Sequence, residues 1–304
     1  MSRIAYFGPI GTFTEQAART LTSAEDELVA AETIPQALDA VRRGEADAAC
    51  VPVENSVEGA VPATLDGLAV HEPLIGVAEA LLPVQFSVLT RDDVSEIRTV
   101  ASHPHALAQV SQWLADNLPG ARVVAARSTA ASAVAVQAGE FDAAVTAPVA
   151  VEHYPLKVLA TGVADVEDAR TRFLLLRKPP VTLPEPTGAD RTSLVAAAAN
   201  RTGALAELLT ELATRGINLT RLDARPGKQN FGEYRFFIDF EGHVAEPRIA
   251  DALTALRRRC RDVRFLGSFA RADGVVATVE PAARNEDFTD AADWVAAVQR
   301  GERA

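Results

Sequence analysis

The stretch Gly44-Glu45-Ala46-Asp47-Ala48-Ala49 leads into a short apolar segment that ends at Pro52, and the chain nearly repeats it. In the second copy, Gly139-Glu140-Phe141-Asp142-Ala143-Ala144 leads into an apolar segment that ends at Pro148. Each copy stops a helical pattern at glycine, which tolerates the left-handed conformation of a helix C-cap, and then begins a strand. The repeat predicts two similar α/β lobes, although an alanine-rich chain also produces this pattern twice by convergence.

The segments around both copies alternate between short apolar runs and helical patterns from residue 3 to residue 178. This alternation is typical of an α/β architecture with mostly parallel strands, whose ligands bind at the carboxyl ends of strands. The predicted strands are 4–7, 28–31, 48–53, 85–90, 99–102, 122–125, 143–146 and 172–176, and the predicted helices are 15–21, 36–43, 61–70, 106–117 and 130–138.

A proline-rich segment at residues 179–190 marks the best domain boundary, because neither helix interiors nor central strands tolerate its four prolines. Beyond it, we predict strand 192–199, helix 203–214, strand 217–222, a Gly/Asn turn at 227–232, strand 234–240, helix 246–259 and strand 263–269. This βαββαβ order is ferredoxin-like. A last short helix at 289–299, with Trp294 and Val295 on or near one face, is expected either to dock or to fray.

Composition narrows the functional class. The 304 residues are 48% hydrophobic, include 58 alanines and carry a net charge of −11, which argues against general binding to nucleic acid or anionic membranes. The charge is uneven, at −11 over residues 1–189, +3 over 190–270 and −3 over 271–304. Two isolated cysteines, no signal-peptide pattern and no long apolar run predict a cytoplasmic protein.

Two polar segments follow strands of the first predicted lobe. In Gly8-Pro9-Ile10-Gly11-Thr12-Phe13-Thr14-Glu15, Thr12 or Thr14 is suited to cap the next helix and to leave backbone N–H groups facing an anion. This segment lacks the signatures of P-loops and dinucleotide-binding loops. In Pro52-Val53-Glu54-Asn55-Ser56-Val57-Glu58-Gly59, the polar groups are costly in a core but suited to a ligand loop. The plainer interpretation of both segments is a capped turn.

Further candidate motifs follow later strands. Ser102-His103-Pro104-His105 lacks a third nearby metal ligand, so a helix start that receives a carboxylate is the more economical interpretation. Ser128-Thr129 offers a similar pair of donors. In Arg170-Thr171-Arg172-Phe173, a guanidinium beside an apolar strand is either exposed at the strand edge or holds an anion through two hydrogen bonds.

Taken in order, these motifs resemble those of the prephenate dehydratase family. The resemblance rests on Gly8-Pro9-x-Gly11-Thr12-Phe13-Thr14, Pro52-x-Glu54-Asn55-Ser56-x-x-Gly59, Ser102-His103-Pro104 and Thr171-Arg172-Phe173. The region after the prolines resembles that family's ACT regulatory domain, through Gly203-Ala204-Leu205 and the stretch from Asn218 to Pro226. The resemblance covers roughly residues 3–270, and chance agreement of so many motifs is improbable.

The resemblance implies a catalytic domain in residues 1–178 with a two-lobed fold like type II periplasmic-binding proteins. Its first lobe would comprise about 1–76 and 160–178, and its second about 77–159. A linker at 179–189, an ACT domain at 190–270 and a tail at 271–304 would follow. The implied reaction converts prephenate to phenylpyruvate, water and carbon dioxide, without a cofactor or metal. The implied regulation is feedback inhibition by L-phenylalanine in a homodimer or tetramer.

The resemblance also implies residue roles. The catalytic threonine falls on Thr171, with Arg172 and Phe173 beside it. The substrate contacts that the resemblance implies are Gly11, Thr12, Asn55, Ser56 and His103. Ser102, Ser128 and Thr129 are expected as further contacts from their positions between a strand and a helix start. The expected L-phenylalanine contacts are Gly203, Ala204, Leu205, Asn218, Leu219, Asp223, Arg225 and Pro226.

Two departures from the family pattern affect these roles. Asp223-Ala224 stands where the family often has Glu-Ser, which bears on effector binding, and Asp168 stands where it often has Asn, which bears on the orientation of Thr171. Prephenate carries two carboxylates and a leaving hydroxyl, so its enzyme needs anion partners such as Arg172 and a proton donor such as Thr171. Arogenate dehydratase and a non-catalytic sensor remain alternatives, although the presence of Thr171 beside Arg172 speaks against the sensor.

Overall fold

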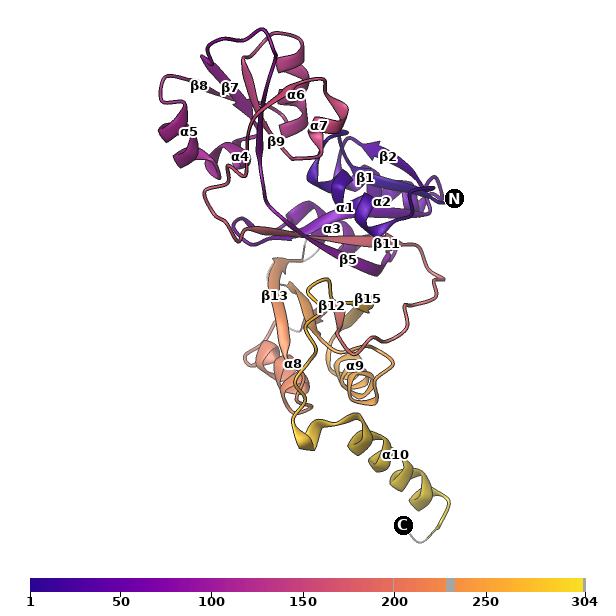
Figure 1. The fold of residues 1–304 in the computed structure, drawn as a ribbon. Helices are drawn as coiled ribbons and strands as arrows, with labels where there is room; N and C mark the ends of the chain where they lie inside the picture. The colour runs from indigo at the N-terminus through magenta and orange to yellow at the C-terminus, as the bar shows by residue number, and fades with distance from the viewer. Residues whose placement is uncertain (199, 228–232, 303–304) are drawn as a thin grey trace. The chain divides into compact units, whose positions relative to one another are not determined.

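The structure, a computed structural model, describes residues 1–198, 200–227 and 233–302. These residues form two units (Figure 1). Unit 1 comprises Met1–Thr64 and Ala80–Leu176, and unit 2 comprises Leu65–Glu79 and Arg177–Ala304. The segment Leu65–Glu79 is thus grouped with the residues from Arg177 onward, although it lies between two parts of unit 1 in the sequence.

The first sheet of unit 1 has the strand order β2-β1-β3-β11, formed by Glu27–Ala31, Arg3–Phe7, Ala48–Asn55 and Arg170–Arg177. Strand β1 pairs in parallel with β2 and β3, whereas β11 runs antiparallel to β3. The short β4 (Gly59–Ala60) pairs with the end of β3. Helices α1 (Phe13–Leu21) and α2 (Ile34–Arg42) bury alanine, leucine and valine side chains, and α3 (Pro62–Val70) follows β4. The carboxyl ends of β1 and β3 therefore meet the start of β11 at one sheet edge.

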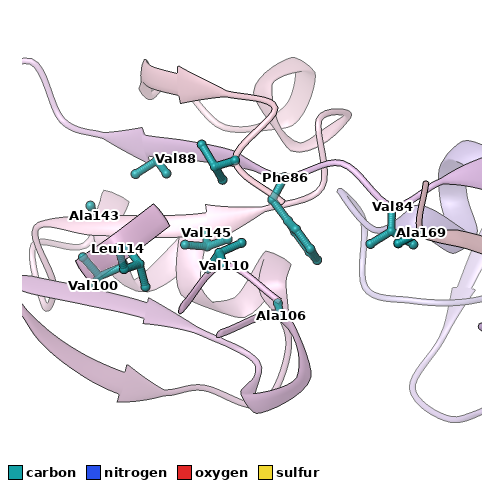
Figure 2. Packing of buried hydrophobic residues seen from close by; sticks show 11 residues of the cluster. Val84, Phe86, Val88, Val100, Ala106, Val110, Leu114, Ala143, Val145 and Ala169 are labelled. Atoms are coloured by element: carbon teal, nitrogen blue, oxygen red, sulfur yellow. The ribbon is translucent and has the colours of Figure 1, made fainter. Parts of the chain in front are cut away.

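The second sheet of unit 1 has the order β10-β6-β9-β7-β8, formed by Lys157–Thr161, Ser87–Thr90, Ala143–Thr146, Thr99–Ser102 and Arg122–Ala125. Its core gathers Val88, Val100, Val145, Val110 and Leu114 from strands and helices, as Figure 2 shows. The helices of this region are α4 (Pro104–Ala108), α5 (Ser111–Asn117), α6 (Thr129–Gln137) and α7 (Ala150–His153). Two α/β sheets thus confirm the predicted fold class of the catalytic region.

Three features differ from the sequence-based expectation: one predicted helix is divided in two, and two strands were not predicted. The predicted helix 106–117 is two helices, α4 and α5, because the chain leaves helical geometry between Ala108 and Ser111. Strand β10 and strand β5 (Ile75–Pro83) were not predicted. In β5 the sequence Ala-Glu-Ala-Leu-Leu favours a helix locally, and strand pairing overrides that preference.

Unit 2 contains β12 (Asp190–Ala198), α8 (Ala204–Ala213), β13 (Leu219–Pro226), β14 (Tyr234–Glu241), α9 (Pro247–Arg259) and β15 (Asp262–Ala270). The predicted βαββαβ order is confirmed, in a sheet ordered β13-β14-β12-β15. Leu194, Leu208, Phe240, Ile249 and Leu256 form its core between sheet and helices. Strand β15 also pairs in parallel with β5, at Gly267 and Gly76. Of the predicted turn at 227–232, all but the first residue lies outside the described residues.

The ends of two helices in unit 2 required correction or extension. Helix α8 begins at Ala204, one residue later than predicted, because Gly203 is the N-cap residue with a φ of +82°. Helix α10 (Asn285–Gln299) begins four residues earlier than predicted, after the short η1 (Pro281–Ala283). No residue of α10 is buried, and Trp294 is 57% exposed. Its docking role therefore stays a prediction.

Candidate active site

Thr171 and Asn55 face each other at the sheet edge where β3 ends and β11 begins. The two residues are cross-strand partners in the β3–β11 ladder, and Asn55 Nδ2 donates a hydrogen bond of 2.9 Å to Thr171 Oγ1. Both side chains are partly buried. Antiparallel pairing therefore joins two motifs that lie 116 residues apart in the sequence.

The Asn55 amide has a defined orientation. Its Oδ1 accepts hydrogen bonds from the backbone N–H groups of Val57, at 2.8 Å, and Glu58, at 3.0 Å. Because both partners are donors, the oxygen must face them and the NH₂ group must face Thr171. Thr171 Oγ1 then acts as an acceptor in the protein, and its own O–H proton is directed elsewhere. Asn55, rather than residue 168, orients the threonine.

Ser56 fixes the start of β11. Its backbone N–H donates to the carbonyl of Arg170 at 2.9 Å, and its Oγ accepts from the Arg170 N–H at 2.9 Å. These bonds lock the residue immediately before Thr171. The structure thus gives Ser56 a positioning contact, in addition to the predicted contact with substrate.

Arg172 leaves β11 on the opposite side from Thr171, because neighbouring side chains of a strand point to opposite faces. It is 5% exposed, and its Nε lies 3.4 Å from Glu54 Oε2. Phe173 is 1% exposed and packs in the core. Both placements favour a role in holding β11 over the predicted contact of Arg172 with a substrate carboxylate, and a substitution distinguishes the two roles.

The loop from Gly8 to Thr12 is closed by internal hydrogen bonds. The Gly11 N–H donates to Glu15 Oε2 at 2.6 Å, so this N–H serves the protein rather than a substrate anion. Gly11 has a φ of +86°, and a Cβ there would lie 2.9 Å from Tyr154 Cε2. Thr12 caps α1, and its hydroxyl donates to the carbonyl of Pro9 at 3.0 Å.

Glu15 is a buried residue that the sequence-based site did not include. Its Oε1 accepts from Arg19 Nη2 at 2.6 Å and lies 2.7 Å from His153 Nε2. Tyr154 donates to the carbonyl of Ile10 at 2.9 Å, and burial followed by the Glu15 charge raises the pKa of Tyr154. The Thr-x-x-Glu spacing of a capping box was the sequence signal available for Glu15. This cluster fixes the loop and joins α1 to α7.

Ser102 and His103 end β7 and begin α4. Ser102 is fully buried and its hydroxyl donates to the carbonyl of Val145 at 2.6 Å, so it serves the second sheet. His103 Nδ1 accepts from the His105 N–H at 3.3 Å. Burial, and then the neighbouring His105, lower the pKa of His103 below its ordinary value. Neutral His103 therefore carries its proton on Nε2, where it is a hydrogen-bond donor.

Ser128 caps α6, with its hydroxyl accepting from the Ala131 N–H at 2.9 Å, and Thr129 is the first helical residue. Strands β7 and β8 are parallel, so the starts of α4 and α6 lie at the same edge of the second sheet. One contact joins this edge to the Asn55 loop: His105 Nδ1 lies 3.4 Å from Glu58 Oε2.

Two of the residues predicted to contact L-phenylalanine line a pocket in unit 2. Ala204 and Leu205, directly after the N-cap Gly203, line a pocket of about 120 Å³ with Asn200, Tyr234 and Phe236. The rings of Tyr234 and Phe236 stack with centroids 6.5 Å apart.

The predicted effector contacts from Asn218 to Pro226 are not among the residues that line this pocket. Asn218 is exposed, and Leu219 packs against the core of unit 2. Asp223 accepts a hydrogen bond from Arg221 at 2.6 Å, and Arg225 pairs with Asp66. Pro226 ends β13 opposite Tyr234.

Among residues 1–198, 200–227 and 233–302, no three His, Cys, Asp or Glu side chains are grouped so that they could hold a metal ion. None of the helices described there combines the length and apolar composition that crossing a bilayer requires.

Comparison with known proteins gives a family match for each of the two regions. The prephenate dehydratase family model matches residues 4–181, and the ACT domain model matches residues 192–258. A prephenate dehydratase of Amycolatopsis methanolica is 91% identical over 304 residues, which is 100% of both chains.

Two solved structures are also similar. A prephenate dehydratase from Arthrobacter aurescens in complex with L-Phe has a TM-score of 0.92 and 42% identity, over 98% of this chain and 99% of that chain. A protein described as a novel type of quorum quenching acylase, GqqA, has a TM-score of 0.80 and 30% identity, over 93% and 100%. From its motifs, its fold and these full-length similarities, the chain belongs to the prephenate dehydratase family.

Proposed function

We propose that this chain converts prephenate to phenylpyruvate, with the Thr171 hydroxyl as the hydrogen-bond donor to the departing oxygen. The observation that carries the proposal is the Asn55 amide, which is locked by two backbone donors and in turn donates to Thr171 Oγ1. In that arrangement the threonine oxygen accepts a hydrogen bond from Asn55, so its own O–H group is available to donate to a ligand.

Apart from one added proton, the atoms and electrons of the reaction balance within the substrate. The bond between the ring and its carboxylate breaks, carbon dioxide leaves, and the electron pair enters the ring. The C–O bond of the ring hydroxyl breaks at the same time, and the hydroxyl takes up a proton and leaves as water. Because the ring becomes aromatic, no redox partner is required.

A threonine hydroxyl is a weak acid, so Thr171 acts chiefly by stabilising charge on the departing oxygen. The proton itself comes from water or from the imidazolium form of His103, because the N–H of a neutral imidazole is too weak an acid to release it. The start of α6, capped by Ser128, is proposed to receive a substrate carboxylate together with Thr129.

The test uses the purified full chain with prephenate and, separately, with arogenate. We expect phenylpyruvate from prephenate with a kcat/KM at least tenfold above that for phenylalanine formation from arogenate. The reverse preference would make the chain an arogenate dehydratase. No product from either compound, with calorimetric binding intact, would indicate a sensor.

We further propose that L-phenylalanine inhibits the enzyme by binding in unit 2. The A. aurescens relative was solved with L-Phe, and here Ala204, Leu205, Tyr234 and Phe236 line a pocket beside the start of α8. Backbone N–H groups at a helix start suit an amino-acid carboxylate, and the aromatic rings suit an aromatic side chain. Initial rates titrated with phenylalanine, tyrosine and tryptophan test this. A flat response to all three, without calorimetric binding, would remove the regulatory role and leave the lyase assignment intact.

A further inference from the structure

One face of the unit 2 sheet carries arginines that contact the carboxyl-terminal half of helix α3. Arg225 Nη2 lies 3.0 and 2.9 Å from the two carboxylate oxygens of Asp66, and Arg225 Nε donates to the first of them at 3.2 Å. Both side chains are about 70% removed from solvent, with exposed fractions of 30% and 26%. A pair with two parallel hydrogen bonds fixes orientation as well as distance.

Two more arginines bind the same end of α3 through its backbone. Arg235 Nη1 donates to the carbonyl of Ala69 at 2.6 Å, and Arg264 Nη1 donates to the carbonyls of Leu68, at 3.0 Å, and His71. The last carbonyls of a helix lack partners within the helix and attract cations. Three arginines from three strands therefore hold the carboxyl-terminal half of α3, from Asp66 to the end.

One of these strands, β14, lines the proposed effector pocket through Tyr234 and Phe236. Arg225 and Arg235 are direct cross-strand partners, and the pairs on either side of them are Pro226 with Tyr234 and Ala224 with Phe236. Because side chains alternate between faces, Tyr234 and Phe236 face the α8 side while Arg225 and Arg235 face α3. A ligand that displaces Phe236 therefore moves the strand positions that carry both arginines.

The other end of α3 leads to the catalytic residues. Thr64, in the first turn, donates to the carbonyl of Pro52 at 2.6 Å, and the Val61 N–H donates to the carbonyl of Val53 at 2.9 Å. Both acceptors lie on β3, two or three residues before Asn55. A rotation or shift of α3 thus acts on the strand that positions the Asn55 amide against Thr171.

We propose that the Asp66–Arg225 pair couples occupancy of the effector pocket to the Asn55–Thr171 contact, with α3 as the connecting element. The inference rests on the proposed inhibition by L-phenylalanine. It assigns to Asp66, which belongs to neither the catalytic site nor the effector pocket, the role of transmitting the signal. Coupling between two sites is reciprocal, so it is measurable from either ligand.

The experiment compares full-length wild type with Asp66→Asn, Asp66→Glu and Asp262→Asn. Asp262 forms an exposed pair with Arg257 on the same unit and is the matched control. The Kd of L-phenylalanine is measured by calorimetry with and without saturating phenylpyruvate. We expect phenylpyruvate to weaken L-phenylalanine binding to wild type by about fivefold or more.

In Asp66→Asn this factor should fall close to 1, with the Kd of L-phenylalanine alone and the uninhibited kcat both within about threefold of wild type. Asp66→Glu should restore part of the coupling, and Asp262→Asn should leave it intact. An unchanged coupling factor in a folded Asp66→Asn variant would overturn the inference.

Hydrogen exchange without any effector separates this inference from the proposed function. If Asp66 acts through α3, amides of residues 55–64 exchange faster in Asp66→Asn than in Asp262→Asn. If wild type does not bind L-phenylalanine, the effector assignment fails. Whether or not L-phenylalanine binds, unchanged exchange at these amides in Asp66→Asn would reject the connection through α3.

Discussion

Asn55 determines the chemistry available to Thr171, because an amide fixed by two backbone donors has only one orientation. Removal of the Thr171 hydroxyl should therefore affect the transition state more than the bound substrate. We expect Thr171→Ala to lower kcat by roughly 10²–10⁴ with little change in KM, and Asn55→Ala to lower it by about 10–100-fold. Thr171→Ser, which keeps a hydroxyl, is the control. Steady-state kinetics with prephenate provide the measurement, and a wild-type kcat in Thr171→Ala would reject the assigned role.

Substitution of Arg172 tests whether this buried cation stabilises strand β11 or binds the substrate. Lysine lacks the planar guanidinium that fits beside Glu54, and it leaves a charge poorly paired in the interior. We expect Arg172→Lys to lower the free energy of unfolding by roughly 1–3 kcal/mol, with KM within about twofold of wild type. Denaturant unfolding and kinetics are compared with those of Arg170→Lys, at an exposed neighbouring position. A raised KM with unchanged stability would instead place Arg172 on the substrate.

His103 should make stability depend on pH, because folding lowers the pKa of its imidazole. Above its ordinary pKa of about 6.5 both folded and unfolded chains hold neutral imidazole. As the pH falls below that value, the unfolded chain takes up a proton first, so the free energy of unfolding decreases.

We expect His103→Asn to reduce this slope in denaturant titrations below about pH 6.5, with His71→Asn, at an exposed histidine, as the control. An unaltered slope in His103→Asn would show that His103 is not the titrating group.

At the level of elements, the contact between β15 and β5 depends on two glycines. Gly267 has a φ of +136°, and a Cβ there would overlap the carbonyl oxygen of Gly76. We expect Gly267→Ala to lower the free energy of unfolding by more than about 2 kcal/mol.

Gly274→Ala is the control, since Gly274 has a φ of +64° but no atom within 4 Å of a new Cβ. Thermal unfolding should show a larger loss of stability in Gly267→Ala, which adds overlap to backbone strain, than in Gly274→Ala, which adds strain alone. Equal losses in the two variants would contradict the close approach of β15 to β5.

At the level of the whole molecule, we predict self-association through unit 2. Strand β13 is an edge of the described sheet, its residues alternate between half-buried and exposed, and Leu222 on it is 38% exposed. Such an edge is suited to cover by a symmetric partner. Sedimentation at micromolar concentration should give a mass of at least twice the 32.2 kDa of one chain.

Leu222→Asp should shift this equilibrium toward the monomer, whereas Val123→Asp, at an exposed valine of unit 1, should not. A wild-type mass of only 32.2 kDa would contradict the prediction.

The sequence alone determined the element types, the α/β and βαββαβ architectures, and the motifs that carry the family resemblance. These follow from short-range rules: periodicity, glycine and proline positions, and residues adjacent in one loop. The family resemblance that those motifs carry made Thr171 and Asn55 candidates. The short-range rules did not predict β5, whose local helix preference is overridden by strand pairing, or the break between α4 and α5.

Only the tertiary structure decided which side chains meet. Asn55 and Thr171 are separated by 116 residues, and Asp66 and Arg225 by 159. No local pattern encodes such pairs, because their geometry depends on strand register and on how helices pack. The fold also committed the Gly11 N–H and the Ser102 hydroxyl to partners within the protein. A polar residue in a motif could bind either substrate or protein, and the requirement that buried polar groups be hydrogen-bonded settles the choice once the fold is formed.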